Sequence, residues 1–131
     1  MILLDTHIWV WWANESPDLS KKHKRIIEES TSDGLGVSVI SCWEVANLVR
    51  LGRLVLNEPA MVWITDALSF SGVRLLELSP RIAVDATELR EFHKDPADRF
   101  LVATARFHDI PIMTKDARIL DYPDVKVITP S

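Results

Sequence analysis

Short apolar runs alternate with helical patterns along almost the whole chain. The apolar runs predict strands at residues 1–5, 35–40, 72–79, 110–114 and 125–129. The segments between them predict helices at residues 20–30, 41–52, 59–70, 80–92 and 96–108. Strands that are separated by helices are typical of βαβ units. Because the runs 2–4, 112–113 and 125–128 are too short and too apolar for half-exposed antiparallel edges, we expect a largely parallel sheet that helices cover on both faces.

The length of the chain sets the expected number of domains. With 131 residues, the chain can bury one core but not two, so we expect a single domain over residues 1–131. The only cysteine, Cys42, cannot form an internal disulfide bond, which fits the reducing cytoplasm. The first residues lack the basic segment and cleavage site of a signal peptide, and no apolar run is long enough for a membrane span. We therefore expect a cytoplasmic protein without a membrane segment.

Acidic residues stand close to the ends of several predicted strands. Asp5 ends the first strand, Glu44 opens the helix after the second, and Asp116 follows the strand at 110–114. Asp98 lies in the first turn of the helix that leads into that strand. In an open parallel sheet, ligand sites form beyond the carboxyl ends of the strands. These four acids can therefore converge at one edge of the sheet.

Each of these acids also has an ordinary explanation as a helix-capping residue. Ser41 and Glu44 have the S-x-x-E spacing of a capping box. Asp95 suits the N-cap of the helix at 96–108, and Asp98 suits the third position of that helix. The other two acids stand where strand-end residues cap the next helix. Only their convergence would distinguish a functional site from four separate caps.

Four converging carboxylates repel one another, and a divalent cation would relieve that repulsion. Mg²⁺ and Mn²⁺ prefer oxygen ligands and are usually held by a few carboxylates together with phosphate. A metal-bound water is a better nucleophile at neutral pH, and the metal stabilises charge on a phosphoryl oxygen. With a hydroxyl such as Thr6 or Thr114 and no covalent nucleophile, the set suggests metal-assisted hydrolysis of a phosphodiester.

The charge and histidine content limit the other site classes. The net charge of −4 argues against a strongly basic nucleic-acid surface, but a metal-neutralised acid cluster still allows nucleic acid as a substrate. The four histidines lack the Cys/His spacing of a zinc site. A magnesium or manganese site therefore suits the sequence better than a zinc site.

Four segments together resemble the PIN domain, and more closely the VapC toxins of type II toxin–antitoxin modules. They cover nearly the whole chain in the expected order and read LLDTHIWVWW, SVISCWEVANLVRLGRL, DPADRFLVATA and IMTKDARIL. The resemblance implies a three-layer α/β/α sandwich with a central, mainly parallel sheet. It also implies an endoribonuclease that depends on Mg²⁺ or Mn²⁺, an RNA substrate, a cognate antitoxin as partner, and a homodimer.

The same resemblance assigns roles to individual residues. The family's acidic site carries over to Asp5, Glu44, Asp98 and Asp116. Of these, the predicted metal ligands are Asp5, Asp98 and Asp116. No acidic position of the family pattern is missing, so an active enzyme is expected.

Four further residues are predicted to support the site. Asp95 matches the first acid of the D-P-x-D-R pattern and is expected to cap its helix, with a role outside the direct metal ligands. Thr114 matches a hydroxyl that often lies near the metal in this family, and Thr6 offers a second hydroxyl. Arg99 is predicted to orient a carboxylate or contact the substrate, although a structural ion pair is the more ordinary role of such an arginine.

Three alternatives of other classes can be compared with this interpretation. A receiver-type signalling domain has a similar length, a parallel sheet and an acid cluster that binds Mg²⁺. It would need an acid pair after the first strand and a phosphoacceptor Asp after the middle strand, and neither is present. A haloacid-dehalogenase-type phosphatase would need an acid at position 7, where the chain has His7. An interaction module without nuclease activity is the remaining alternative.

The N-terminal segment contains three closely spaced tryptophans, Trp9, Trp11 and Trp12. They cannot all face one side of a helix. We therefore expect at least one of them to be exposed or to lie at an interface, where tryptophan is enriched.

Overall fold

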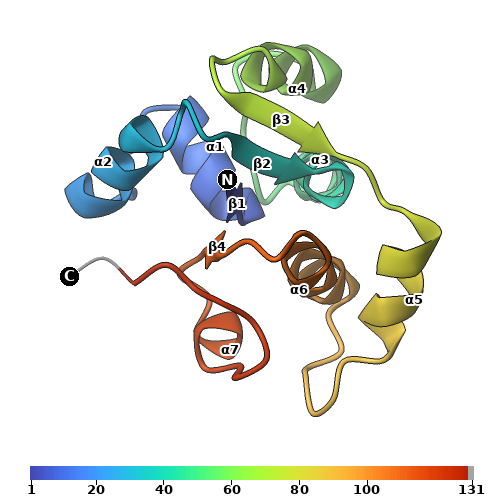
Figure 1. Ribbon diagram of the computed structural model, residues 1–131. Coiled ribbons are helices and arrows are strands. Elements are labelled where there is room, and N and C mark those ends of the chain that lie inside the picture. Colours follow the sequence, from blue (N-terminus) through green and yellow to red (C-terminus); the bar gives the residue numbers. More distant parts are fainter. Residues whose placement is uncertain (130–131) are drawn as a thin grey trace.

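The computed structural model describes residues 1–129, and its centre is a parallel four-stranded sheet (Figure 1). The strands are β1 Ile2–Leu4, β2 Leu35–Ser38, β3 Val73–Leu76 and β4 Ile112–Met113. They lie in the order β3-β2-β1-β4, so β1 has neighbours on both sides. Leu3 of β1 pairs with Gly36 of β2 and with Ile112 of β4. The predicted parallel sheet is confirmed.

Helices connect the strands, and a short helix follows β4. Their bounds are α1 Thr6–Ala13, α2 Lys21–Glu29, α3 Val39–Arg50, α4 Ala60–Leu68, α5 Pro80–Thr87, α6 Pro96–His108 and α7 Ala117–Leu120. Helix α6 has the predicted cap and bounds, with Asp95 at the N-cap and Pro96 in the first turn. Within residues 1–129, no helix combines the length and the apolar character that crossing a membrane requires.

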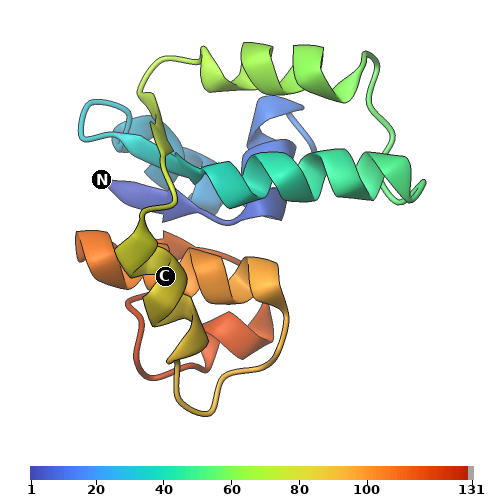
Figure 2. The same ribbon diagram turned by 90° about the vertical axis from the view of Figure 1, so that its right-hand side faces the viewer.

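The side chains of the central strand alternate between two hydrophobic cores. Ile2 and Leu4 of β1 pack with apolar residues of α1, α2, α3 and α4. Leu3 points the other way and packs with residues of α6 and α7. In Figure 2, α4 lies above the strands and α5, α6 and α7 lie below them, while α3 extends to the side from β2. The predicted α/β/α sandwich is confirmed.

The helix after β2 begins earlier than predicted. Ser38, the last residue of β2, caps α3 because its Oγ accepts the N–H of Ile40 at 3.1 Å. The predicted cap, Ser41, instead lies inside the helix and is fully buried. The capping-box interpretation of Ser41 and Glu44 is therefore wrong.

Two C-terminal segments are shorter than predicted. Helix α5 ends at Thr87 rather than at residue 92, because Arg99 takes the carbonyl groups that would continue it. The predicted strand at 125–129 is reduced to an isolated bridge between Val127 and Ile112. Residues 130–131 of the predicted single domain lie outside the described residues, and the domain limits stay a prediction.

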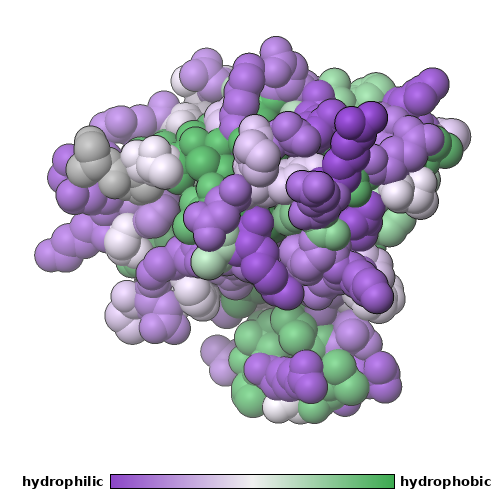
Figure 3. All heavy atoms as spheres, turned by 90° about the horizontal axis from the view of Figure 1, so that it is seen from below, coloured by the Kyte–Doolittle hydropathy of each residue, from purple (hydrophilic) through white to green (hydrophobic). Residues whose placement is uncertain are grey.

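Exposed apolar side chains gather on the hairpin of α3 and α4. They are Trp43, Leu51, Val55, Met61 and Val62. The face in Figure 3 is mostly hydrophilic, with a hydrophobic lobe at its lower edge and smaller hydrophobic areas above it. An apolar surface of this kind is typical of a protein–protein contact.

The N-terminal tryptophans do not supply this exposed surface. Trp9 is buried, whereas Trp11 and Trp12 are half-buried against His7 and Phe70, respectively. None of the three is exposed, so the prediction that at least one is exposed or lies at an interface now rests on an interface role, which stays a prediction. The exposed tryptophan is Trp43, which the tryptophan cluster in the sequence did not indicate.

Candidate functional site

A pocket of about 240 Å³ lies where β1 and β4 end. From β1, the chain continues to β2 on one side, whereas β4 lies on the other side of β1. Open parallel sheets bind ligands at such a switch in strand order. Its lining includes the carboxylates of Asp5, Glu44, Asp95, Asp98 and Asp116, which we call the acid cluster. The four acids singled out in the sequence thus line one pocket, together with the predicted cap Asp95 and Thr6.

Asp5 is held by hydrogen bonds from two elements. It follows β1, caps α1 and is 3% exposed. Its Oδ1 accepts the backbone N–H of Thr6 at 2.7 Å, and its Oδ2 accepts the hydroxyl of Thr114 at 2.5 Å. Thr114 follows β4, and its Oγ1 accepts the N–H of Asp116 at 3.0 Å. This network joins the ends of β1 and β4 at the pocket.

Asp98 lies in the first turn of α6, and its burial disfavours ionisation. Its backbone N–H donates to the Oδ1 of the cap, Asp95, at 3.2 Å, while its own side chain lines the pocket. Burial, followed by the charges of the other four members of the acid cluster, raises the pKa of Asp98 to about 8. A carboxyl group with this pKa needs a nearby cation to be fully ionised at neutral pH.

Glu44 reaches the pocket from α3. Its position is set one turn earlier, where the buried Ser41 Oγ accepts the hydroxyl of Thr6 at 2.8 Å and ties α3 to α1. Burial raises the pKa of Glu44, and the charges of Asp5 and Asp95 raise it further. Glu44 is therefore a carboxyl group with a raised affinity for a proton beside the more buried acids.

Asp116 is paired with Arg118, which was not singled out in the sequence. Its Oδ1 accepts the N–H and the Nε of Arg118 at 2.9 and 3.2 Å, and its Oδ2 accepts Nη2 at 3.0 Å. The same Nη2 lies 3.5 Å from Asp98 Oδ2. The hydrogen bonds of Arg118 lower the pKa of Asp116. Arg118 thus supplies positive charge to the acid cluster.

Two histidines also contact the acid cluster. His93 accepts the N–H of Asp95 at Nδ1 (3.3 Å), so its neutral ring carries the proton on Nε2, 3.0 Å from Asp98 Oδ2. That contact is close but poorly aligned for a hydrogen bond. His7 accepts the N–H of Lys115 at Nε2, and its Nδ1 lies 3.6 Å from Asp5 Oδ2. Their positions two residues from Asp95 and Asp5 are the sequence signal that could have identified them.

Arg99 does not line the pocket. Its guanidinium donates to the carbonyls of Ala86, Thr87, Leu89, Phe92 and His93, at 2.8–3.3 Å. These carbonyls belong to the end of α5 and the loop before α6. None of these hydrogen bonds is to a carboxylate or to a residue that lines the pocket. The predicted role of Arg99 in orienting a carboxylate or binding substrate is replaced by a structural role in the loop that carries His93.

The donors of the acid cluster fit a hard divalent cation, because they are carboxylate oxygens and one of them, Asp98, is buried with a raised pKa. Within residues 1–129, no three acidic, histidine or cysteine side chains already stand as a coordination sphere. Several oxygens instead accept hydrogen bonds from Thr114 and Arg118. Small side-chain shifts would therefore accompany the binding of a cation.

The raised pKa of Asp98 predicts how stability depends on pH in the absence of metal. Between about pH 4 and 8, the folded protein keeps a proton on Asp98 that the unfolded chain releases, so the free energy of unfolding should fall as pH rises. The lowered pKa of His93 acts in the opposite direction up to its ordinary value of 6.5. The fall should therefore be clearest between about pH 6.5 and 8.

Replacing Asp98 with Asn should abolish this fall. In chelator at pH 8, we expect D98N to be more stable than the parent by about 2 kcal/mol, a value reduced by solvent screening. Urea unfolding at a series of pH values measures this, with the exposed Asp33→Asn as control. A D98N protein less stable than the parent at pH 8 would mean that Asp98 is a simple helix-capping residue.

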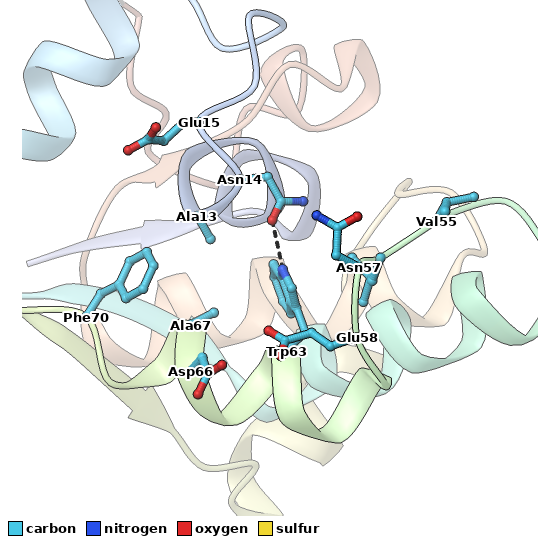
Figure 4. A pocket seen from close by; sticks show the side chains of 11 residues that line it. Ala13, Asn14, Glu15, Val55, Asn57, Glu58, Trp63, Asp66, Ala67 and Phe70 are labelled. Atoms are coloured by element: carbon cyan, nitrogen blue, oxygen red, sulfur yellow. Dashed lines mark hydrogen bonds between the residues drawn. The ribbon is translucent and has the colours of Figure 1, made fainter.

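A larger pocket, of about 420 Å³, lies away from the acid cluster, between the end of α1 and α4 (Figure 4). Trp63 Nε1 donates to Asn14 Oδ1 at 2.8 Å across it. Its carboxylates, which include Glu15 and Glu58, are exposed to solvent. This larger pocket lacks buried, converging polar groups. The smaller pocket with the acid cluster is therefore the better candidate for chemistry.

Comparisons with known proteins place the chain in a family. The PIN domain family matches residues 2–125. Ribonuclease VapC22 of Mycobacterium tuberculosis is 34% identical over 98% of this chain and 96% of its own length. The VapBC2 complex of Rickettsia felis bound to a promoter DNA fragment has a chain with a TM-score of 0.73, 18% identity and 98% coverage of both chains. VapC20 of M. tuberculosis, a toxin that cleaves the sarcin–ricin loop, has a TM-score of 0.64 and 18% identity over 96% of this chain and 99% of its own.

Proposed function

The chain belongs to the PIN domain family, and we propose that it is an endoribonuclease that acts as the toxin of a toxin–antitoxin pair. The observation that carries the proposal is the convergence of Asp5, Glu44, Asp98 and Asp116 in one pocket at the sheet edge. The mycobacterial relative is a ribonuclease by name, which supports RNA as the substrate.

The proposed reaction is hydrolysis of an RNA phosphodiester by water. A bound Mg²⁺ or Mn²⁺ would supply Lewis acidity and lower the pKa of water. Asp5, Asp98 and Asp116 are the residues that would hold the ion. Glu44, with its raised pKa, is suited to accept a proton from the attacking water at a carboxylate oxygen.

The remaining predicted residues keep the acids in place. Thr114 holds Asp5 Oδ2, and Thr6 holds Asp5 Oδ1 through its N–H and Ser41 through its hydroxyl. Asp95 caps α6 and so sets the direction of the Asp98 side chain. In this proposal, Thr6, Thr114 and Asp95 position the acids rather than contact the reacting atoms.

The proposed protein partner is a cognate antitoxin. The Rickettsia structure is a toxin–antitoxin complex, which supports such a partner. We propose that an arginine or lysine of the antitoxin enters the acid cluster, where charge-assisted hydrogen bonds to carboxylates are strong. The exposed apolar side chains of the α3–α4 hairpin offer a contact surface for the antitoxin or for a second copy of the chain, since a homodimer is also expected.

Expression in bacterial cells, followed by sequencing of RNA 5′ ends, tests the proposal. We expect growth arrest and new, discrete RNA ends when the protein is expressed alone, and neither effect with Asp5→Asn. The purified protein should cut the same RNA in Mg²⁺ or Mn²⁺ and not in chelator. Growth arrest by both the parent and D5N, without new RNA ends, would point to an interaction module instead of a nuclease.

A further inference from the structure

Arg118 is a mostly exposed cation at the centre of a group of acids. Its side chain is 57% exposed and lines the pocket of the acid cluster. Its guanidinium forms a fork with both oxygens of Asp116 and approaches Asp98 Oδ2 at 3.5 Å. In the absence of any other cation, Arg118 is therefore a counter-ion of the acid cluster.

We propose that Arg118 is an RNA-binding residue that shares its carboxylates with the divalent cation. In this scheme, the cation displaces the guanidinium from Asp98 and Asp116, and the released guanidinium binds a phosphate of the RNA. The inference rests on the proposed nuclease function and adds a substrate contact to it.

The displacement follows from competition for the same oxygens. Asp116 Oδ2 accepts Nη2 of Arg118 at 3.0 Å, and Asp98 and Asp116 are two of the acids that would hold the ion. A guanidinium and a divalent cation repel each other and cannot occupy the same carboxylate edge. Binding of the ion therefore requires Arg118 to move.

The structure allows Arg118 to move without loss of the fold. Helix α7 stays capped, because Asp116 Oδ1 holds the backbone N–H of Arg118 independently of its side chain. A guanidinium matches the geometry of phosphate as well as that of carboxylate. Arg53 lines the same pocket from the α3–α4 hairpin, so arginines border the acid cluster from two elements. A polyanion that crosses the acid cluster needs positive charge in these places.

The test compares Arg118→Gln with Arg106→Gln. Arg106 also lies beside a carboxylate, Asp124, but outside the acid cluster. For R118Q, titration calorimetry should show Mg²⁺ binding about five- to tenfold tighter than in the parent, because the competing charge is gone. At saturating Mg²⁺, the KM for RNA should rise about tenfold. The slope of log KM against log salt should also fall by about 0.7, as expected for one lost phosphate contact on a single strand. R106Q should match the parent in all three measurements.

The direction of the change in Mg²⁺ affinity and in the salt slope distinguishes a substrate contact from a structural ion pair. If Arg118 only stabilises Asp116, R118Q should bind Mg²⁺ equally or more weakly, and the salt slope should stay unchanged; either result overturns the inference. Arg118→Lys, which keeps the charge but loses the fork, should bind Mg²⁺ as the parent does and still show a raised KM. A parent that neither binds Mg²⁺ nor cuts RNA would instead overturn the proposed function itself.

Discussion

Replacing Asp98 with Asn is expected to slow RNA cleavage by about a hundredfold or more, which corresponds to about 3 kcal/mol of transition-state stabilisation. The variant keeps the size and shape of the side chain but removes its charge. Asp98 is buried in the pocket, with its Oδ2 3.0 Å from His93 Nε2 and 3.5 Å from Arg118 Nη2, so its charge lies among the other groups of the site. Initial rates on a defined RNA in Mg²⁺ measure the loss.

The neighbouring Asp95→Asn is the matched control for this experiment. Asn is an adequate N-cap, so the bond from Asp98 N–H should survive and the rate should fall by much less. If D98N cuts RNA as fast as the parent, Asp98 is not part of the reaction. A loss of activity in D95N equal to that in D98N would give Asp95 a chemical role beyond capping.

Replacing Arg99 with Met is expected to lower the free energy of unfolding by about 3 kcal/mol or more. The substitution leaves five backbone carbonyls without their charged donor, four of them in partly buried bonds, and a buried acceptor without a partner costs about 1–3 kcal/mol. Arg99→Lys should lose most of the same stability, because an ammonium group cannot form the fork. Urea unfolding of the purified variants measures both values.

Arg81→Met is the control, since Arg81 is an exposed arginine on α5 whose ion-pair partner is Asp85. Its removal should cost less than about 1 kcal/mol. An R99M protein as stable as R81M would show that water replaces the guanidinium around the loop. Loss of RNA cleavage in R99M without any loss of stability would restore the direct site role that the sequence predicted for Arg99.

The architecture of the protein could be predicted because its signals are local. Three-residue apolar runs such as Ile2–Leu4 suit a strand covered on both faces, and the Asp95-Pro96 pair marks the start of α6. The position of the acids at one edge followed from topology, since the carboxyl ends of parallel strands share an edge. The family match also removes the receiver-type alternative.

The parts that could not be predicted depend on contacts between distant residues. Ser41 looked like a cap, but its hydroxyl is taken by Thr6, 35 positions earlier, while Ser38 does the capping. Arg99 stood beside an acid in sequence, yet its partners are carbonyls 6–13 positions away. Arg118 has no sequence pattern that marks it as a site residue, and the only signal of the two site histidines is their spacing of two residues from Asp95 and Asp5.

The acid cluster draws its members from positions 5, 44, 95, 98 and 116, and β4, which positions Thr114 against Asp5, is the last strand of the sheet. During synthesis, the N-terminal acids therefore leave the ribosome long before their partners exist. A growing chain cannot complete the pocket until residues 114–118 have emerged. The nuclease activity that we propose would then begin only after Asp116 has left the ribosome, so shorter nascent chains lack a complete acid cluster.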